Sequence, residues 1–223
     1  RLIALAPASV QEMADFVGIA FDLAFKYRNP AIILADGVIG QMMEKVVLPE
    51  QRTRLTDEEV IARCPWATTG RTHHRTPNII TSLELDPAEM EKRNIHLQKK
   101  YAEIEENEVR FEELHCEDAE YLIVAFGSCA RIAQKAMEMA REEGIKVGLL
   151  RPITLWPFPS KAIAARAAQV KGILTVELNA GQMVEDVRLA VKCKVPVEHF
   201  GRLGGIVPDP DEVITALKEK LIK

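Results

Sequence analysis

The sequence lacks the patterns that mark several classes of protein. Its four cysteines are widely spaced and include no Cys-x-x-Cys pair, so this chain alone shows no zinc or iron–sulfur signature. No apolar run is long enough to span a bilayer, and no secretory leader is visible. Neither a P-loop nor a full dinucleotide-binding fingerprint is present. We therefore expect a globular protein with reduced thiols, which is typical of the cytoplasm.

What is present is the composition of a folded, mildly acidic chain. Of its 223 residues, 48% are hydrophobic and 28% are charged, which suffices for one large or two small cores. The formal net charge of −4 gives no reason to expect nucleic acid or an anionic membrane as a partner.

The amino-terminal part has the pattern of a strand–helix–strand unit. Ser9 and Glu12 predict a capping box for a helix that runs to about Tyr27. The continuous apolar run 31–35 is typical of a parallel strand that is covered on both faces. Residues 45–86 then show weak periodicity and predict a surface linker, whereas 87–114 predict one long charged helix.

From residue 121 onward, strands and helices alternate regularly. This alternation predicts a mostly parallel α/β sheet with right-handed crossovers, and we expect 118–223 to form a self-contained five-stranded domain. The expected strands are 121–126, 147–150, 172–177 and 195–200, and the expected helices are 130–143, 160–169, 182–192 and 210–221.

Four turns in this part mix small residues with hydrogen-bonding side chains. In an open parallel sheet, ligands bind beyond the carboxyl ends of the strands, so these turns should converge on one edge. The three arginines near them would make that edge locally positive and attractive to phosphate or to an acidic partner surface. The candidate residues for this edge are Ser128, Arg131, Arg151, Asn179, Gln182 and Arg202.

Single residues near this edge allow two interpretations each. Gly127-Ser128 is either a helix start that binds an anion or an ordinary strand-to-helix turn. Arg131 opposes the helix dipole there, which indicates an anionic partner, including a carboxylate across an interface. Glu177 is either a general base or a residue that holds a backbone turn. Cys129 is better explained as a small buried residue than as a reactive thiol.

Two adjacent histidines invite a metal-binding interpretation. His73-His74 precede Arg75, and neighbouring histidines do not readily bind one ion from a regular element. They are expected to be hydrogen-bonding loop residues, and we name no metal ligand in this chain.

Four segments resemble the alpha subunit of 2-oxoacid:ferredoxin oxidoreductases, and the resemblance covers essentially the whole chain. The Gly-Arg-Leu-Gly-Gly sequence resembles the branched-chain type, which acts on 2-oxoisovalerate. The segments are Pro30–Glu44 (PAIILADGVIGQMME), Leu150–Pro159 (LRPITLWPFP), Val176–Glu185 (VELNAGQMVE) and Gly201–Pro210 (GRLGGIVPDP).

The resemblance implies a domain organisation. An amino-terminal domain holds the aminopyrimidine of thiamine diphosphate, and a domain similar to the carboxy-terminal domain of transketolase follows it. We therefore expect 1–44 to be the end of an incomplete pyrimidine-binding domain. Residues 45–117 would be a linker and a long charged helix, and 118–223 would be the transketolase-like domain.

The resemblance also implies the chemistry and the partners. A separate beta subunit holds the diphosphate and Mg²⁺, and iron–sulfur clusters lie on other polypeptides. The reaction decarboxylates a 2-oxoacid, transfers the acyl group to coenzyme A and passes two electrons to ferredoxin. The second domain lies near the coenzyme A side of the cleft, so the six edge residues are candidates for contact with coenzyme A or a partner subunit.

The family's activating glutamate is expected upstream of Arg1. We accordingly name no catalytic residue, and expect the isolated chain to be inactive and to hold no cofactor alone. Two other functions stay open. One is the beta chain of a 2-oxoacid dehydrogenase or another transketolase relative, which would copurify with a lipoyl protein rather than an iron–sulfur subunit. The other is a non-catalytic module that only docks subunits.

Overall fold

A computed structural model describes residues 1–68 and 78–222 of the chain. The histidine pair considered as a metal site, His73-His74, lies outside the described residues. In the described part of the chain, no helix is long and apolar enough to cross a membrane.

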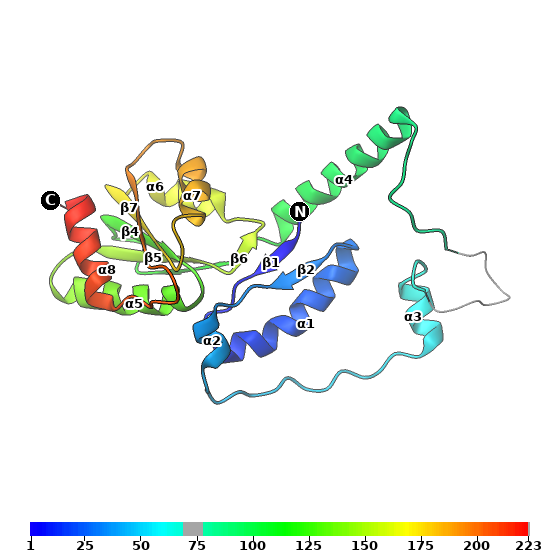
Figure 1. Ribbon diagram of the computed structural model, residues 1–223, viewed down its shortest axis with the longest axis horizontal. Coiled ribbons are helices and arrows are strands. Elements are labelled where there is room, and N and C mark those ends of the chain that lie inside the picture. Colours follow the sequence, from blue (N-terminus) through cyan, green and yellow to red (C-terminus); the bar gives the residue numbers. More distant parts are fainter. Residues whose placement is uncertain (69–77, 223) are drawn as a thin grey trace. The chain divides into compact units, whose positions relative to one another are not determined.

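The chain divides into two compact units. Unit 1 comprises Arg1–Val47 together with Glu103–Lys223, and unit 2 comprises Leu48–Ala102. Unit 2 contains the helix α3 (Asp57–Arg63) and most of α4 (Pro87–Asn107). The remaining elements, all in unit 1 and labelled where there is room in Figure 1, are β1 (Ile3–Leu5), α1 (Val10–Tyr27), β2 (Ala31–Ile33), α2 (Gly37–Gln41), β3 (Phe111–Leu114), β4 (Tyr121–Ala125), α5 (Gly127–Glu142), β5 (Val147–Pro152), β6 (Thr154–Trp156), α6 (Ser160–Ala167), β7 (Gly172–Glu177), α7 (Met183–Val191), β8 (Val197–Gly201), α8 (Pro210–Leu217) and a terminal π-helix, Lys218–Ile222.

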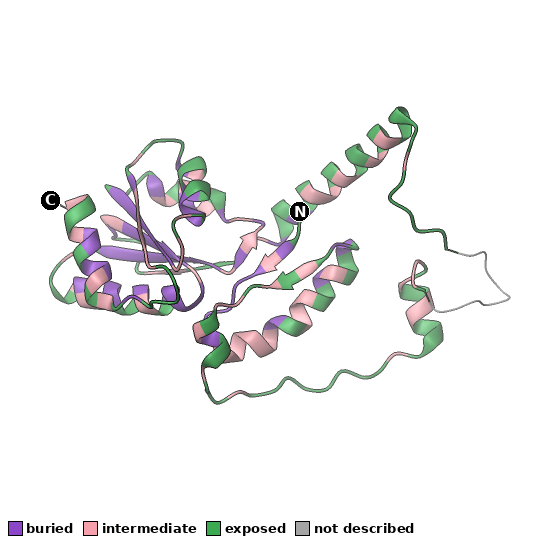
Figure 2. Ribbon diagram, in the orientation of Figure 1, coloured by how far each residue is buried: buried purple, intermediate pink, exposed green. Residues whose placement is uncertain are grey.

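A five-stranded sheet in the order β3-β5-β4-β7-β8 forms the larger core of unit 1. Strands β5, β4, β7 and β8 run parallel, and β3 joins β5 antiparallel at one edge. Helices α5 and α8 cover one face, and α6 and α7 cover the other (Figure 1). The strands between these helices are buried (Figure 2), which explains their near-continuous apolar sequences. The predicted α/β class with a mostly parallel sheet is confirmed.

A smaller sheet in the order β2-β1-β6 forms the other part of unit 1. Strands β1 and β2 are parallel, as expected for the strand–helix–strand pattern, and α1 packs against them. Strand β6 pairs antiparallel with β1, so the segment after β5 contributes to the amino-terminal sheet. The sequence interpretation did not include β6, because three residues between prolines carry no periodicity signal.

The helix predicted for 87–114 is wrong at its carboxyl end. It ends at Asn107, and Phe111–Leu114 instead form β3, the antiparallel edge strand of the large sheet. Pairing with β5 satisfies the backbone groups of this charged segment, and tertiary context of this kind overrides local helix preference. The fifth strand therefore lies before 118 rather than within 118–223. The domain boundaries at 44 and 117 themselves stay predictions.

One carboxylate connects the two sheets of unit 1. Asp36 follows β2 and caps α2, because its Oδ1 accepts from the N–H groups of Val38 and Ile39, both at 3.0 Å. Its Oδ2 accepts from the N–H of Ser128 at 2.8 Å, at the start of α5. Gly127 has φ +61°, and a Cβ there would lie 2.7 Å from Asp36 Oδ2. The contact therefore requires glycine at this position.

We predict that Gly127→Ala destabilises the chain by about 2–4 kcal/mol, because a side chain in the left-handed region is strained and would also displace Asp36. Gly144→Ala is the matched control, since Gly144 also has positive φ, +84°, but has nothing within 4 Å of the added Cβ. The control should cost only about 1 kcal/mol. Urea denaturation of the chain measures both, and equal losses would show that the Asp36 contact contributes nothing.

The cysteines differ in their expected reactivity. Burial, followed by the nearby carboxylates of Asp36 and Glu177, raises the pKa of Cys129 to about 12, and burial chiefly raises that of Cys116 to about 11. Cys193 is exposed. We predict that iodoacetamide at pH 8 modifies Cys193 within minutes and leaves Cys129 and Cys116 unmodified until the protein is denatured, as measured by peptide mass spectrometry. Rapid native-state modification of Cys129 would contradict this burial.

Candidate functional site

The carboxyl ends of the parallel strands lie along one edge of the five-stranded sheet. Strands β4, β7 and β8 end at Ala125, Glu177 and Gly201, and their parallel pairing places the following turns next to one another. Ser128, Asn179, Gln182 and Arg202 belong to these turns or to the helix starts after them. Arg131 is the fifth residue of α5, whereas Arg151 lies within β5 and is buried.

A cavity of about 200 Å³ opens at this edge. Of the six candidates, Asn179 and Gln182 line it, and the other four do not. The remaining lining comes from the ends of β2, β4 and β7 and the start of α5: Leu34, Ala35, Asp36, Phe126, Gly127, Cys129, Glu177 and Leu178.

Glu177 is buried and stabilises the turn after β7. Its carboxylate accepts from three backbone N–H groups, those of Gln182 at 3.2 Å, Met183 at 2.8 Å and Val184 at 3.0 Å. Those of Met183 and Val184 are the first N–H groups of α7, so Glu177 acts as the anion at a helix amino-terminus. His199 Nδ1 lies 3.4 Å from Glu177 Oε1. With its acceptor sites occupied in this way, the carboxylate fits the interpretation in which it holds a backbone turn.

Asn179 contributes to the same turn. Its Oδ1 accepts from the Gly181 N–H at 2.7 Å, and Gly181 has φ +106°. A Cβ on Gly201 would lie 2.3 Å from the Asn179 carbonyl oxygen, so the end of β8 packs directly against this turn. The Asn-Ala-Gly sequence is thus explained first by backbone geometry.

Ser128 does not cap α5 with its side chain. The N-cap residue is Phe126, and Ser128 Oγ is buried and has no hydrogen-bond partner among the described residues. The backbone N–H of Ser128 binds Asp36 instead. The start of α5 therefore already has an anion, which is supplied by this chain.

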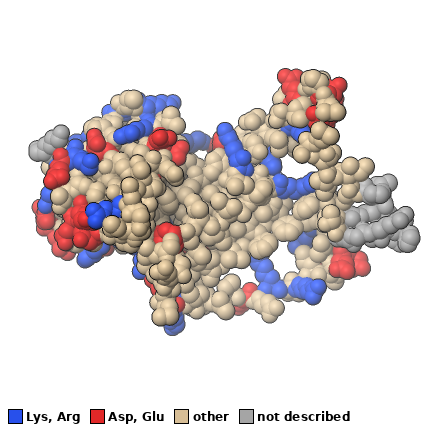
Figure 3. Space-filling view, viewed as in Figure 1, with Lys and Arg blue, Asp and Glu red and all other residues tan. Residues whose placement is uncertain are grey.

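Each of the three arginines has a carboxylate partner in the same chain. Arg131 Nη1 binds Glu44 at 2.7 Å, and Arg202 Nη1 lies 3.3 Å from Glu212. Arg151 Nη2 binds both oxygens of Glu12 at 2.6 and 2.7 Å. On the face in Figure 3, acidic and basic residues lie interspersed. The ion pairs of Arg131, Arg151 and Arg202 reduce the positive field expected at the edge.

The surroundings of Glu44, the partner of Arg131, lower the pKa of its carboxyl group. The backbone N–H of Val10, followed by the Arg131 guanidinium, holds the pKa of Glu44 below its ordinary value. Arg131 thus finds its anionic partner 87 residues earlier in the chain, which local reading of the sequence does not show. Arg151 likewise contacts Glu112 at 3.1 Å and links β5 to both α1 and β3.

Sequence reasoning did not include Asp36 or His199 among the site residues. The available signal for Asp36 was an Asp-Gly pair directly after an apolar strand, which is a typical helix-cap position. His199 sits inside β8, and only its distance from Glu177 distinguishes it. Within residues 1–68 and 78–222, no group of three or more His, Cys, Asp or Glu side chains could hold a metal ion.

Two family models match the chain. Residues 1–115 match pyruvate flavodoxin/ferredoxin oxidoreductase, thiamine diphosphate-binding, and residues 119–213 match pyruvate:ferredoxin oxidoreductase core domain II. The subunit VorB of a ketoisovalerate oxidoreductase from Methanothermobacter marburgensis is 46% identical over 98% of this chain and 60% of its own length. The 2-oxoglutarate synthase subunit KorA from Archaeoglobus fulgidus is 32% identical over 93% of this chain and 58% of its own length.

Solved structures share the fold. The 2-oxoglutarate:ferredoxin oxidoreductase from Magnetococcus marinus, with 2-oxoglutarate, coenzyme A and succinyl-CoA bound, aligns with a TM-score of 0.74 at 23% identity, over 98% of this chain and 42% of that one. A split-gene transketolase aligns with a TM-score of 0.54 at 14% identity, over 99% of this chain and 57% of that one. This chain spans about 60% of the length of the VorB relative. It belongs to the pyruvate:ferredoxin oxidoreductase family.

Proposed function

We propose that this chain is part of a thiamine-diphosphate-dependent oxidoreductase that decarboxylates a branched-chain 2-oxoacid. The products are acyl-coenzyme A, CO₂ and reduced ferredoxin. The observation that carries the proposal is the graded similarity, 46% to a ketoisovalerate oxidoreductase subunit against 32% to a 2-oxoglutarate synthase subunit. Both relatives are named as subunits of 2-oxoacid enzymes, which favours this function over a dehydrogenase beta chain or a docking module.

The proposal assigns the cofactors to the complex. A beta subunit would hold the diphosphate of thiamine diphosphate and Mg²⁺, an iron–sulfur subunit would carry electrons to ferredoxin, and no step of the reaction is assigned to a residue of this chain. The four cysteines are free, which fits the reducing cytoplasm to which we assign the complex.

The strand-end edge is proposed to face coenzyme A or a neighbouring subunit. Arg131 and Arg202 support this role, because each is partly exposed and makes its ion pair through a single nitrogen. Each guanidinium has five N–H donors, so both retain donors for a phosphate or a carboxylate. Arg151 is buried and bound to two carboxylates, so its proposed task is to hold the edge in place.

The amino-terminal 44 residues are proposed to be the end of a larger pyrimidine-binding domain. Three large apolar side chains of α1, at successive helical turns, support this: Val17, Phe21 and Phe25 are each about half exposed. Strand β2 is an edge strand of its sheet, with one side free to pair with a further strand.

We predict that the complex purified anaerobically through a tag on this chain reduces ferredoxin in a reaction that requires coenzyme A. Its kcat/KM should be at least about tenfold higher for 2-oxoisovalerate than for pyruvate or 2-oxoglutarate, because a pocket discriminates methyl groups by roughly that factor and charged groups by more. Spectrophotometric assay of the three substrates decides this. A preference for 2-oxoglutarate would remove the branched-chain assignment, and no coenzyme A-dependent reduction with any of them would remove the oxidoreductase proposal.

Arg131→Ala and Arg202→Ala are predicted to weaken subunit assembly or raise the KM for coenzyme A by roughly ten- to a hundredfold, the value of a charge-assisted hydrogen bond. Lys220→Ala is the control, since Lys220 is exposed on the terminal helix. Circular dichroism should show that all three variants remain folded. If assembly and the KM are unchanged in both arginine variants, these residues are ordinary surface charges.

A further inference from the structure

The described residues of unit 2 form no hydrophobic core. None of its described residues, 48–68 and 78–102, is buried. Ordering a backbone has an entropic cost that buried apolar surface normally offsets, and a helix as short as the seven-residue α3 is unstable alone in water. The surface that stabilises unit 2 must therefore lie outside this unit.

The segment Asn78–Asp86, here called the arm, exposes four large aliphatic side chains of unit 2. It contains two acidic residues, Glu84 and Asp86, and no basic residue. Its aliphatic side chains lie mostly in solvent: Ile79 is 89% exposed, Ile80 62%, Leu83 69% and Leu85 83%.

Polar contacts hold the arm in this open conformation. Asn78 Nδ2 donates to the Pro65 carbonyl oxygen at 3.0 Å. Farther along, Arg93 of α4 donates to the Thr81 carbonyl oxygen at 3.1 Å. Asp86 caps α4 by accepting from the Ala88 N–H at 2.8 Å. A segment restrained in this way loses less conformational entropy when it binds.

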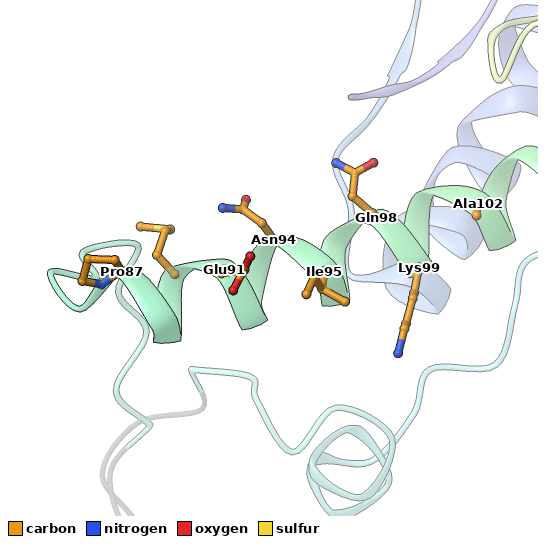
Figure 4. A pocket seen from close by; sticks show the side chains of 8 residues that line it. Pro87, Glu91, Asn94, Ile95, Gln98, Lys99 and Ala102 are labelled. Carbon is orange, nitrogen blue, oxygen red and sulfur yellow. The ribbon is translucent and has the colours of Figure 1, made fainter.

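The adjoining face of α4 is also uncovered. A shallow hollow of about 710 Å³ runs along the helix, and all of its lining residues belong to α4. Figure 4 shows Pro87, Ile95 and Ala102 spaced along the helix, together with the longer side chains of Gln98 and Lys99. The arm and this face together present an extended apolar surface.

A groove of about 370 Å³ in unit 1, here called the basic groove, has the complementary chemistry. It lies where α7 ends and β8 begins, at the amino-terminal end of the parallel strands and next to the edge strand β8. Its lining contains no acidic residue and consists of Arg188, Val191, Cys193, Lys194, Val195, Pro196 and Val197.

The cations beside this groove have no acidic partner in the described part of the chain. Arg188 donates to the Val197 carbonyl oxygen at 3.1 Å, and Lys192 and Lys194 are exposed. None of the three forms an ion pair with a described carboxylate, in contrast to Arg131, Arg151 and Arg202. An apolar groove with unpaired cations attracts an apolar segment that carries acidic residues.

We propose that the arm of one copy of this chain docks into the basic groove of a second copy. The aliphatic side chains of the arm would fill the apolar floor between Val191 and Val197, and Asp86 would approach Lys194. Because each copy has one arm and one groove, two copies can satisfy both contacts around a twofold axis. A stable interface needs roughly 20–30 residues on each side, and in a twofold pair each copy contributes its arm, the adjoining face of α4 and its groove, which together reach that size.

Sedimentation equilibrium of the chain tests this pairing. The wild type should dimerise, and Leu83→Asp or Lys194→Glu should each raise the dimer dissociation constant by roughly tenfold or more. Two matched controls should leave it unchanged. Leu48→Asp changes an exposed apolar residue of unit 2 outside the arm, and Lys220→Glu changes an exposed lysine far along the sequence from the groove.

Cross-linking identifies the partner of the arm. Leu85→Cys in a Cys64→Ser background places one thiol in the arm. In the proposed pair, this thiol would face the exposed Cys193 in the groove of the second copy. A short bismaleimide should join two differently tagged copies, and adding Cys193→Ser should abolish the product. A monomeric wild type, a cross-link within one chain, or dimerisation that is indifferent to Leu83→Asp and Lys194→Glu would each overturn the proposal.

Discussion

The carboxylate of Asp36 is the contact on which the arrangement of unit 1 depends. It follows β2, caps α2 through Oδ1 and accepts from the Ser128 N–H near the start of α5 through Oδ2. One side chain therefore connects the segment after β2 in the smaller sheet to the first helix of the larger one. Gly127 makes this approach possible because a side chain there would collide with Oδ2. Asp36 and Gly127 both line the cavity at the strand-end edge.

Charge compensation within the chain shapes that edge. Asp36 and Glu177 occupy the amino-termini of α5 and α7, where a ligand anion would otherwise be expected. The nearby arginines are held by Glu44, Glu12 and Glu212. The edge is therefore an internally paired surface, whereas cations without a described acidic partner gather at the opposite ends of the strands. The two ends of the sheet therefore differ in whether their charges are paired. The paired end is proposed to face coenzyme A or a neighbouring subunit, and the other end is proposed to bind the arm.

Much of the fold could be predicted because it follows from local periodicity. The alternation of apolar strands and amphipathic helices after residue 121 identified the parallel sheet, and the apolar run before Asp36 identified β2. Strands β3 and β6 could not be predicted in the same way. β3 is charged and β6 has three residues, so each is a strand only because a neighbouring strand, β5 or β1, offers backbone partners. Pairing across long sequence separations leaves no local signal.

The sequence by itself determined the α/β class, the family and the edge on which the strand-end turns converge, because chain order and the parallel direction of strands are enough to place those turns together. Only the tertiary structure decided the chemistry of that edge. Arg131 meets Glu44 across 87 residues and Arg151 meets Glu12 across 139, and no residue spacing reveals such pairs. A charge seen in a sequence becomes a binding group or a structural one according to what the fold places within a few ångströms of it, since its interaction energy depends on that distance and on burial.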